Sequence, residues 1–87
     1  MHMETLLEIV EQAPLEDCRS AEILAANLYK QITPYIEKGI STAEEELDFC
    51  SMVDIMLDEG GLTNQNARAA VLNQIYDATG FPHIYKG

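Results

Sequence analysis

The sequence predicts an all-α fold, a compact four-helix domain, on two observations. Apolar residues recur at helical spacing through four segments, and glycine or proline stands just past the end of each one. The alternation of apolar and polar residues that marks a half-buried strand never lasts more than a few residues. We expect a single helical domain over residues 4–80, a cloning remnant or disordered start at 1–3, and a C-terminal tail at 81–87.

The first and last predicted helices have clear start or stop signals in the sequence. The first is short, from residue 4 to 13, and Pro14 ends it because proline cannot continue a helix. The fourth follows a cap at Thr63, runs to about Thr79 and stops at Gly80. Its apolar face is expected to hold Ala67, Ala70, Val71, Ile75 and Ala78.

The second predicted helix contains a proline. It follows a cap at Asp17 or Ser20 and keeps the helical period as far as Ile36. Pro34 falls inside this pattern, so either it kinks the helix or Thr33 caps a separate turn. The helical spacing also places one aliphatic residue of this segment, Ile23, away from the apolar stripe.

The central stretch, residues 42–59, organises the chain. Ser41 and Thr42 are both good N-cap residues, and the carboxylate three positions on from each, Glu44 or Glu45, gives the capping-box spacing. We expect Gly60 and Gly61 to end this helix in the left-handed conformation that glycine adopts easily. The expected buried face holds Phe49, Cys50, Val53, Met56 and Leu57, with Met52 at its edge.

Two aliphatic residues break the pattern of this helix. Leu47 and Ile55 project from its polar side, among carboxylates. One interpretation is that a central helix is covered nearly all round, so that both residues belong to the core. The other is that they stay exposed for a functional contact, because an apolar residue on a polar face without visible compensation marks a candidate site.

Negative charge is both large and concentrated. Five basic residues face fifteen acidic ones, which gives a net charge of −10. Seven of the fifteen acids lie in the central helix, which has no lysine or arginine: Glu44, Glu45, Glu46, Asp48, Asp54, Asp58 and Glu59. This charge argues against direct binding of nucleic acid or anionic lipid, and it favours either a solvated face or a basic partner protein.

Motifs for chemistry are absent from the sequence. Cys18, Cys50 and His83 are too scattered for a zinc site or a nucleophile–base pair, so we expect no metal, no cofactor and no enzymatic activity. No apolar run is long enough to span a membrane and no signal peptide is visible, which favours the cytoplasm. The tail, with Phe81, Ile84 and Tyr85, either folds back on the core or forms a free docking peptide.

One short stretch resembles a known family. The string Ser41–Leu47, STAEEEL, is similar to an acidic stretch in the small four-helical immunity proteins of nuclease colicins. That family has about this length and charge, and the resemblance implies a four-helix fold and a nuclease as the partner. It covers under a tenth of the chain, and the paired tyrosines that follow the stretch in that family are absent here. No residue's role is carried over.

The sequence favours a small acidic inhibitor that acts as a nucleic-acid mimic and occludes a basic, nucleic-acid-handling partner, in the manner of anti-CRISPR, anti-restriction and nuclease-immunity proteins. The partner is expected to be a nuclease or a nucleic-acid-binding complex. The alternative is a structural or chaperone-like helical subunit, which would act as a homo-oligomer or bind a partner helix. The predicted partner-binding residues are Glu44, Glu45, Leu47, Asp48, Asp54, Ile55, Asp58 and Glu59.

Overall fold

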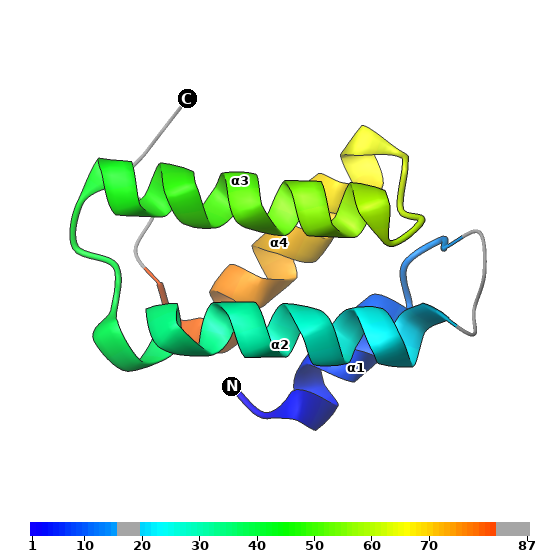
Figure 1. The fold of residues 1–87 in the computed structure, drawn as a ribbon, viewed down its shortest axis with the longest axis horizontal. Coiled ribbons are helices and arrows are strands. Elements are labelled where there is room, and N and C mark those ends of the chain that lie inside the picture. The colour runs from blue at the N-terminus through cyan, green and yellow to red at the C-terminus, as the bar shows by residue number, and fades with distance from the viewer. Residues whose placement is uncertain (16–19, 82–87) are drawn as a thin grey trace.

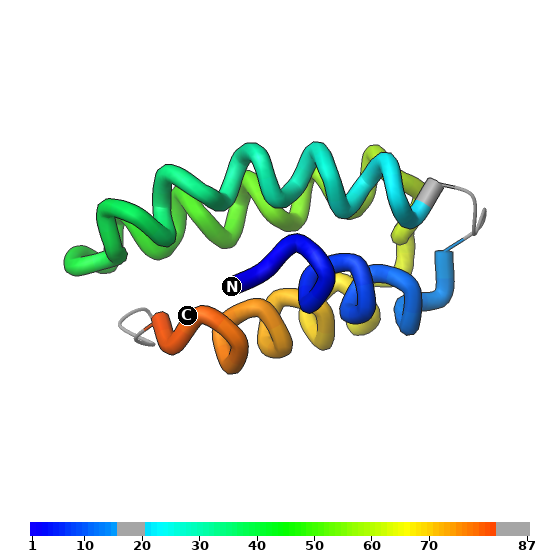
Figure 2. Tube along the Cα trace, turned by 90° about the horizontal axis from the view of Figure 1, so that it is seen from below, coloured from blue at the N-terminus to red at the C-terminus, as the bar shows by residue number. Residues whose placement is uncertain are grey.

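The computed structural model describes residues 1–15 and 20–81, and in these residues it contains four α-helices and no strand (Figure 1). The helices are α1 (Met3–Glu11), α2 (Ser20–Lys38), α3 (Ala43–Glu59) and α4 (Gln65–Thr79). The antiparallel pair α2 and α3 forms one layer, and α1 and α4 form the other (Figure 2). The predicted four-helix fold with a short first helix is therefore confirmed.

The core lies between the two layers. Its largest fully buried side chains come from all four helices and the α3–α4 turn: Phe49, Leu6, Leu28, Ile32, Leu57, Leu62, Ile75, Val10, Val53 and Val71. Each such side chain stabilises the fold by about 1.5–3 kcal/mol relative to an exposed one. Because α3 packs against α2 on one flank and α4 on the other, its outer face is left at the surface.

Phe49 is the centre of an aromatic cluster at one end of this core. Its ring meets those of Tyr35, Tyr76 and Phe81 edge to face, with centroids 5.3, 5.9 and 5.3 Å away. This geometry is preferred because the positive ring edge faces the negative ring face. Phe81, the first tail residue, thus packs on the core. The two alternatives for the rest of the tail, 82–87, lie outside the described residues.

The end of α3 is a Schellman motif. The Leu62 amide donates to the Leu57 carbonyl (2.9 Å) and the Gly61 amide donates to the Asp58 carbonyl (3.2 Å). Gly61 has φ +103°, the conformation that requires glycine, but Gly60 has φ −81°. The sequence prediction is therefore correct for Gly61 and wrong for Gly60, which has a different role described below.

The boundaries of α1 differ from the prediction at both ends. The helix begins at Met3, and Met1 packs against the core, so part of the segment assigned to a disordered start is helical. The helix ends at Glu11 instead of Ala13, because the ring of Pro14 disfavours the helical conformation in the residue before it. Whether residues 1–3 are a cloning remnant stays a prediction.

Helix α2 continues through Pro34 as one element. The separate turn capped by Thr33 is therefore wrong: the Thr33 hydroxyl donates instead to the carbonyl of Tyr29, one turn earlier in the same helix (2.6 Å). Helix α2 begins at Ser20, and its predicted caps, Asp17 and the side chain of Ser20, lie outside the described part of the chain and stay predictions.

Helix α4 is capped one residue later than predicted. The side chain of Asn64, and not that of Thr63, accepts the amide of the residue three positions on (3.0 Å). The predicted face is also partly wrong, because Ala70 and Ala78 are exposed while Tyr76 is buried. Alanine gains little from burial, whereas a tyrosine ring gains much if its hydroxyl finds a partner.

Candidate protein-binding surface

The eight residues predicted to bind a partner lie along α3. Seven of them are exposed and one, Glu45, is half-buried. The aliphatic side chains of Leu47 and Ile55 are 45% and 55% exposed. Both therefore lie at the surface, and the interpretation that places them in the core is wrong. Their role in binding a partner stays a prediction.

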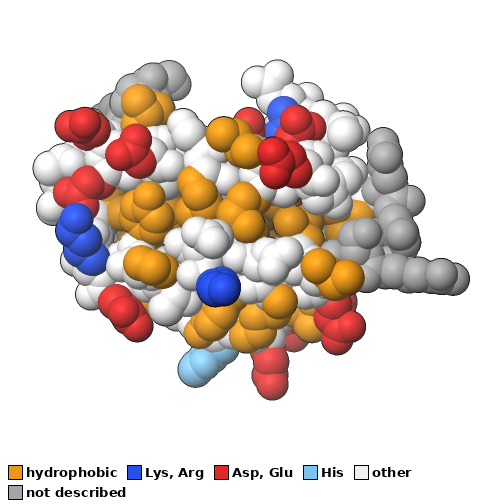
Figure 3. All heavy atoms as spheres, in the orientation of Figure 1, with side chains coloured by type: hydrophobic (Ala, Val, Ile, Leu, Met, Phe, Trp, Pro, Cys, Tyr) orange, Lys and Arg blue, Asp and Glu red, His pale blue; other side chains and the backbone are white. Residues whose placement is uncertain are grey.

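The face formed by α2 and α3 carries apolar atoms between charged ones. Figure 3 shows a band of hydrophobic side chains across this face, with Asp and Glu side chains gathered toward both ends of α3. In the described residues, the large apolar side chains with high exposure all belong to these two helices: Ile23 (67%), Leu47 and Ile55. Exposed apolar surface with a polar rim is typical of protein-binding sites.

Arg68, on α4, neutralises part of the acidic surface. Its Nε donates to Asp54 Oδ1 (2.7 Å), and its Nη1 lies 3.4 Å from Asp58 Oδ1. The same Nη1 donates to the carbonyls of Leu62 (3.1 Å) and Thr63 (2.8 Å). One guanidinium thus ties the end of α3 to the turn and to α4, and it occupies two predicted partner-binding carboxylates. Sequence reasoning missed this pairing because the residues are ten and fourteen positions apart.

The carboxylate of Glu45 takes part in the N-terminal cap of α3. The Thr42 hydroxyl accepts the Glu45 amide (3.1 Å), so Thr42 and not Ser41 is the cap of the two that the sequence offers, and the hydroxyls of Ser41 and Thr42 donate to Glu45 Oε1 (3.1 Å each). Lys38 lies 3.7 Å from the other carboxylate oxygen. The pKa of Glu45 is lowered by these contacts, most by the hydrogen bond from Ser41 and then by Thr42 and Lys38.

Glu46 is buried, which the sequence did not predict. Its side chain is 2% exposed at the α3–α4 contact, where it interacts with the Tyr76 hydroxyl. That hydroxyl also lies 3.2 Å from the Cys50 sulfur. Burial, followed by the contact with Cys50 and the charge of Glu46, raises the pKa of Tyr76. Burial likewise raises the pKa of the half-buried Cys50 thiol, so this cysteine is a poor nucleophile at neutral pH.

The position of Glu46 relative to two core residues of α3 indicated that its side chain faces the core. Glu46 precedes Phe49 by three residues and Val53 by seven, so all three share one face of the helix. The charge of the carboxylate hid this periodicity, because a glutamate in the first turn of a helix normally faces solvent. Cys18 and His83 lie outside the described residues.

Three carboxylates of α3 remain available at the surface. Within the described residues, Glu44, Asp48 and Glu59 are exposed and have no ion-pair partner. Together with Leu47 and Ile55 they form what we call the open α3 surface. A carboxylate without a partner can pair with an incoming cation at no cost in broken contacts, so these five residues are the part of the predicted site that is free to bind.

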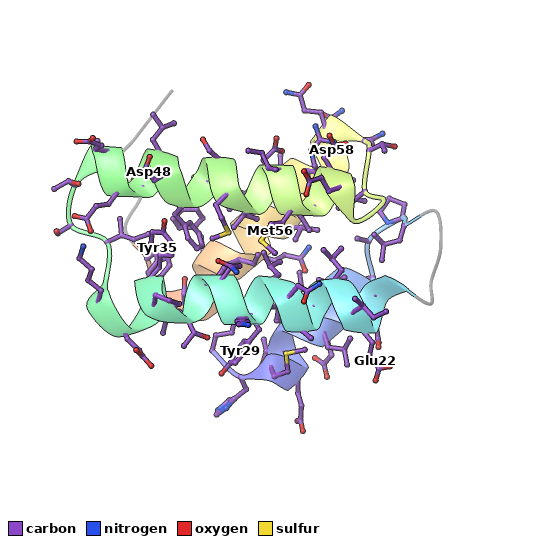
Figure 4. All side chains as sticks on the ribbon, in the orientation of Figure 1. Glu22, Tyr29, Tyr35, Asp48, Met56 and Asp58 are labelled. Atoms are coloured by element: carbon purple, nitrogen blue, oxygen red, sulfur yellow. The ribbon has the colours of Figure 1, made fainter. Side chains whose placement is uncertain are left out.

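Two surface pockets flank α3. One, of about 310 Å³, lies between α3 and α4 and includes Cys50 and Arg68 in its lining. The other, of about 320 Å³, lies between α2 and α3 and includes Ile23 and Met56. Figure 4 shows Met56 in the space between these two helices. Both volumes are near the lower limit for small-molecule sites.

The described residues hold neither a cluster of metal-ligating side chains nor a helix that could cross a membrane. Over 1–15 and 20–81, no three His, Cys, Asp or Glu side chains come together as metal ligands. None of the helices there combines the length and the apolar character that a bilayer span requires.

Comparison of the chain with protein-family models, with curated proteins and with solved structures finds no match. The resemblance of Ser41–Leu47 to the immunity proteins therefore assigns no role.

Proposed function

We propose that this protein is a small acidic binding protein without enzymatic activity, which occludes a basic surface on a nucleic-acid-handling partner. Anti-CRISPR, anti-restriction and nuclease-immunity proteins act in this manner. The observation that carries the proposal is the open α3 surface, where Leu47 and Ile55 are exposed among carboxylates that have no ion-pair partner in the described chain.

The two kinds of side chain have different roles in this mechanism. The net charge of −10 attracts a basic partner over a distance and speeds the encounter. Apolar side chains that become buried in the complex slow its dissociation. Glu44 and Asp48 lie near one end of α3 and Glu59 at the other, so a partner that pairs with both ends must also cover Leu47 and Ile55 between them. Occlusion then prevents nucleic acid from using the same basic groups.

Affinity capture with matched variants tests the proposal. The bait proteins are the wild type, Leu47→Ser/Ile55→Ser and Glu44→Gln/Asp48→Asn/Glu59→Gln, each exposed to nuclease-treated lysate of the native host. The control, Glu4→Gln/Glu8→Gln/Glu11→Gln, removes the same charge from exposed positions on α1. We expect a basic protein that is retained by the wild type and the α1 control and lost by both α3 variants. The wild type should also displace nucleic acid from that protein after purification.

Two outcomes would contradict the proposal. A captured protein that distinguishes neither α3 variant from the α1 control would show that the open α3 surface does not bind it. A partner that keeps its nucleic acid in the presence of saturating wild-type protein would exclude occlusion. A stable oligomer of the protein alone at micromolar concentration, measured by light scattering, would instead favour the structural-subunit alternative.

A further inference from the structure

The pocket between α2 and α3 lies beside the open α3 surface and has a composition of its own. Its lining is formed by three residues of α2 and three at the end of α3: Ile23, Leu24, Asn27, Met56, Glu59 and Gly60. Leu24 and the half-buried Met56 give it an apolar floor, and Ile23, 67% exposed, stands at its edge. One carboxylate, that of Glu59, lines the pocket, and no basic residue does.

The walls of this pocket are fixed by close packing of the two helices. A Cβ atom at Gly60 would lie only 2.6 and 2.8 Å from the two terminal methyl groups of Leu24. The absence of a side chain at Gly60 therefore lets α2 and the end of α3 approach at this point. Because a helix and a helix terminus form the walls, the pocket is preformed and can receive a side chain without ordering a loop.

The dimensions and spacing fit the side chains of a helix. A volume of about 320 Å³ accommodates an apolar anchor, and Met56 can adjust its shape to the anchor it meets. Met52, half-buried on the same flank of α3, precedes Met56 by one turn, or about 6 Å along the axis. A partner helix with apolar residues at positions i and i+4 has the same spacing, so it can lie along α2 and α3 with one residue in the pocket.

Charge decides which helix fits. A second copy of this chain would bring another net charge of −10 against the acidic α3, and the two Glu59 carboxylates would repel one another. A basic helix would instead place lysine or arginine beside Glu59 and the other free carboxylates of α3. We propose that the α2–α3 pocket binds an apolar side chain of a basic amphipathic helix in the partner. This inference rests on the proposed function and names the part of the partner that binds.

A synthetic peptide tests the pocket directly. The probe is a Leu/Lys peptide of about four helical turns with leucines at i, i+3, i+4 and i+7. The control peptide has the same composition with leucine and lysine alternating. Binding is followed by methyl NMR of the full-length protein and by fluorescence anisotropy. We expect the largest shifts at the methyl groups of Ile23 and Met56, and weaker binding of the alternating peptide.

Variants separate this pocket from the open α3 surface. Ile23→Ser should weaken binding of the helical peptide by about fivefold or more, and Leu47→Ser, an equal apolar loss at another exposed position, by less than twofold. The inference is overturned if the peptide does not bind, if Ile23→Ser has no effect, or if the alternating peptide binds equally well. Shifts of Ile23 and Met56 that depend on protein concentration alone would identify a second copy as the occupant.

The two proposals can fail separately. Peptide shifts confined to Leu47 and Ile55 would overturn the pocket and leave the open α3 surface as the binding site. Peptide binding in the pocket, combined with captured partners that are indifferent to Leu47→Ser/Ile55→Ser, would support the pocket and overturn the proposed function of the open α3 surface, because neither of these two residues lines the pocket.

Discussion

Arg68 offers a quantitative test of how the acidic end of α3 is held. Arg68→Met keeps the aliphatic stem of a side chain that is 14% exposed and removes every donor. The two lost hydrogen bonds to the carbonyls of Leu62 and Thr63 each contribute about 1 kcal/mol, since both groups are partly reached by water. The carboxylates are 53% and 58% exposed, so together they add only about 0–1 kcal/mol.

The expected loss is therefore about 2–3 kcal/mol in the free energy of unfolding, which lowers the Tm of a domain this size by roughly 10–20 °C. Urea denaturation and thermal melting followed by circular dichroism measure both quantities. Lys30→Met is the matched control, because Lys30 is exposed on α2 and should change stability by less than about 0.5 kcal/mol.

Salt distinguishes the two contributions of Arg68. Raising the ionic strength from about 0.1 to 1 M shortens the screening length from about 10 to 3 Å and weakens the exposed ion pairs. The hydrogen bonds to the carbonyls are short-range and are screened much less. Most of the difference between wild type and Arg68→Met should therefore persist at 1 M salt. A loss below about 0.5 kcal/mol at either salt concentration would refute the structural role described for this arginine.

Three further predictions concern α3 and its neighbours. Tyr76→Phe should destabilise by about 1–3 kcal/mol in urea denaturation, because buried Glu46 loses a partner, whereas Tyr35→Phe should have little effect. Gly60→Ala should destabilise by about 1–2 kcal/mol through overlap with Leu24, and Leu24→Ala should then cost less in that background than in wild type; equal costs would exclude the overlap. The lowered pKa of Glu45 means that its contribution to stability is present above the unfolded value of 4.5 and is lost as the pH falls through the lower folded value. Urea midpoints of wild type and Glu45→Gln should therefore differ at pH 7 and converge below pH 4.5, whereas a constant difference would contradict the assignment.

The sequence predicted the helices well because their local signals agree with their packing. The Thr42 cap and the Gly61 stop follow from hydrogen bonds formed within a few residues of each position. The error at the start of α4 lies where two adjacent residues, Thr63 and Asn64, are chemically equivalent as caps. In that case the path of the connecting turn selects the cap, and the local sequence carries little information about that path.

The candidate site could be predicted only in part, for a physical reason. The position of Leu47 and Ile55 on the polar side of α3 followed from helical periodicity, which left open whether other helices cover them; both are exposed. Whether each carboxylate is free, paired or buried could not be predicted in this way, because it depends on contacts between helices. Arg68 reaches Asp54 from α4, and Tyr76 meets Glu46 across the same interface. A list of acidic residues therefore overstates the charge that a partner meets.

Some carboxylates of α3 are paired or buried and others are free. Long-range attraction of a basic partner and direct contact with it therefore depend on different sets of acids. All acids contribute to long-range attraction, but at about 0.15 M salt the screening length is only about 8 Å. The molecule measures 18 Å along its shortest axis, and α1 lies in the layer behind α2 and α3, as Figure 2 shows. Charges on α1 are thus largely screened from a partner on the open α3 surface. Equal charge removed from the two helices must therefore have unequal effects on affinity at physiological salt if a partner binds to α3. That inequality depends on where the partner sits and not on how acidic the protein is.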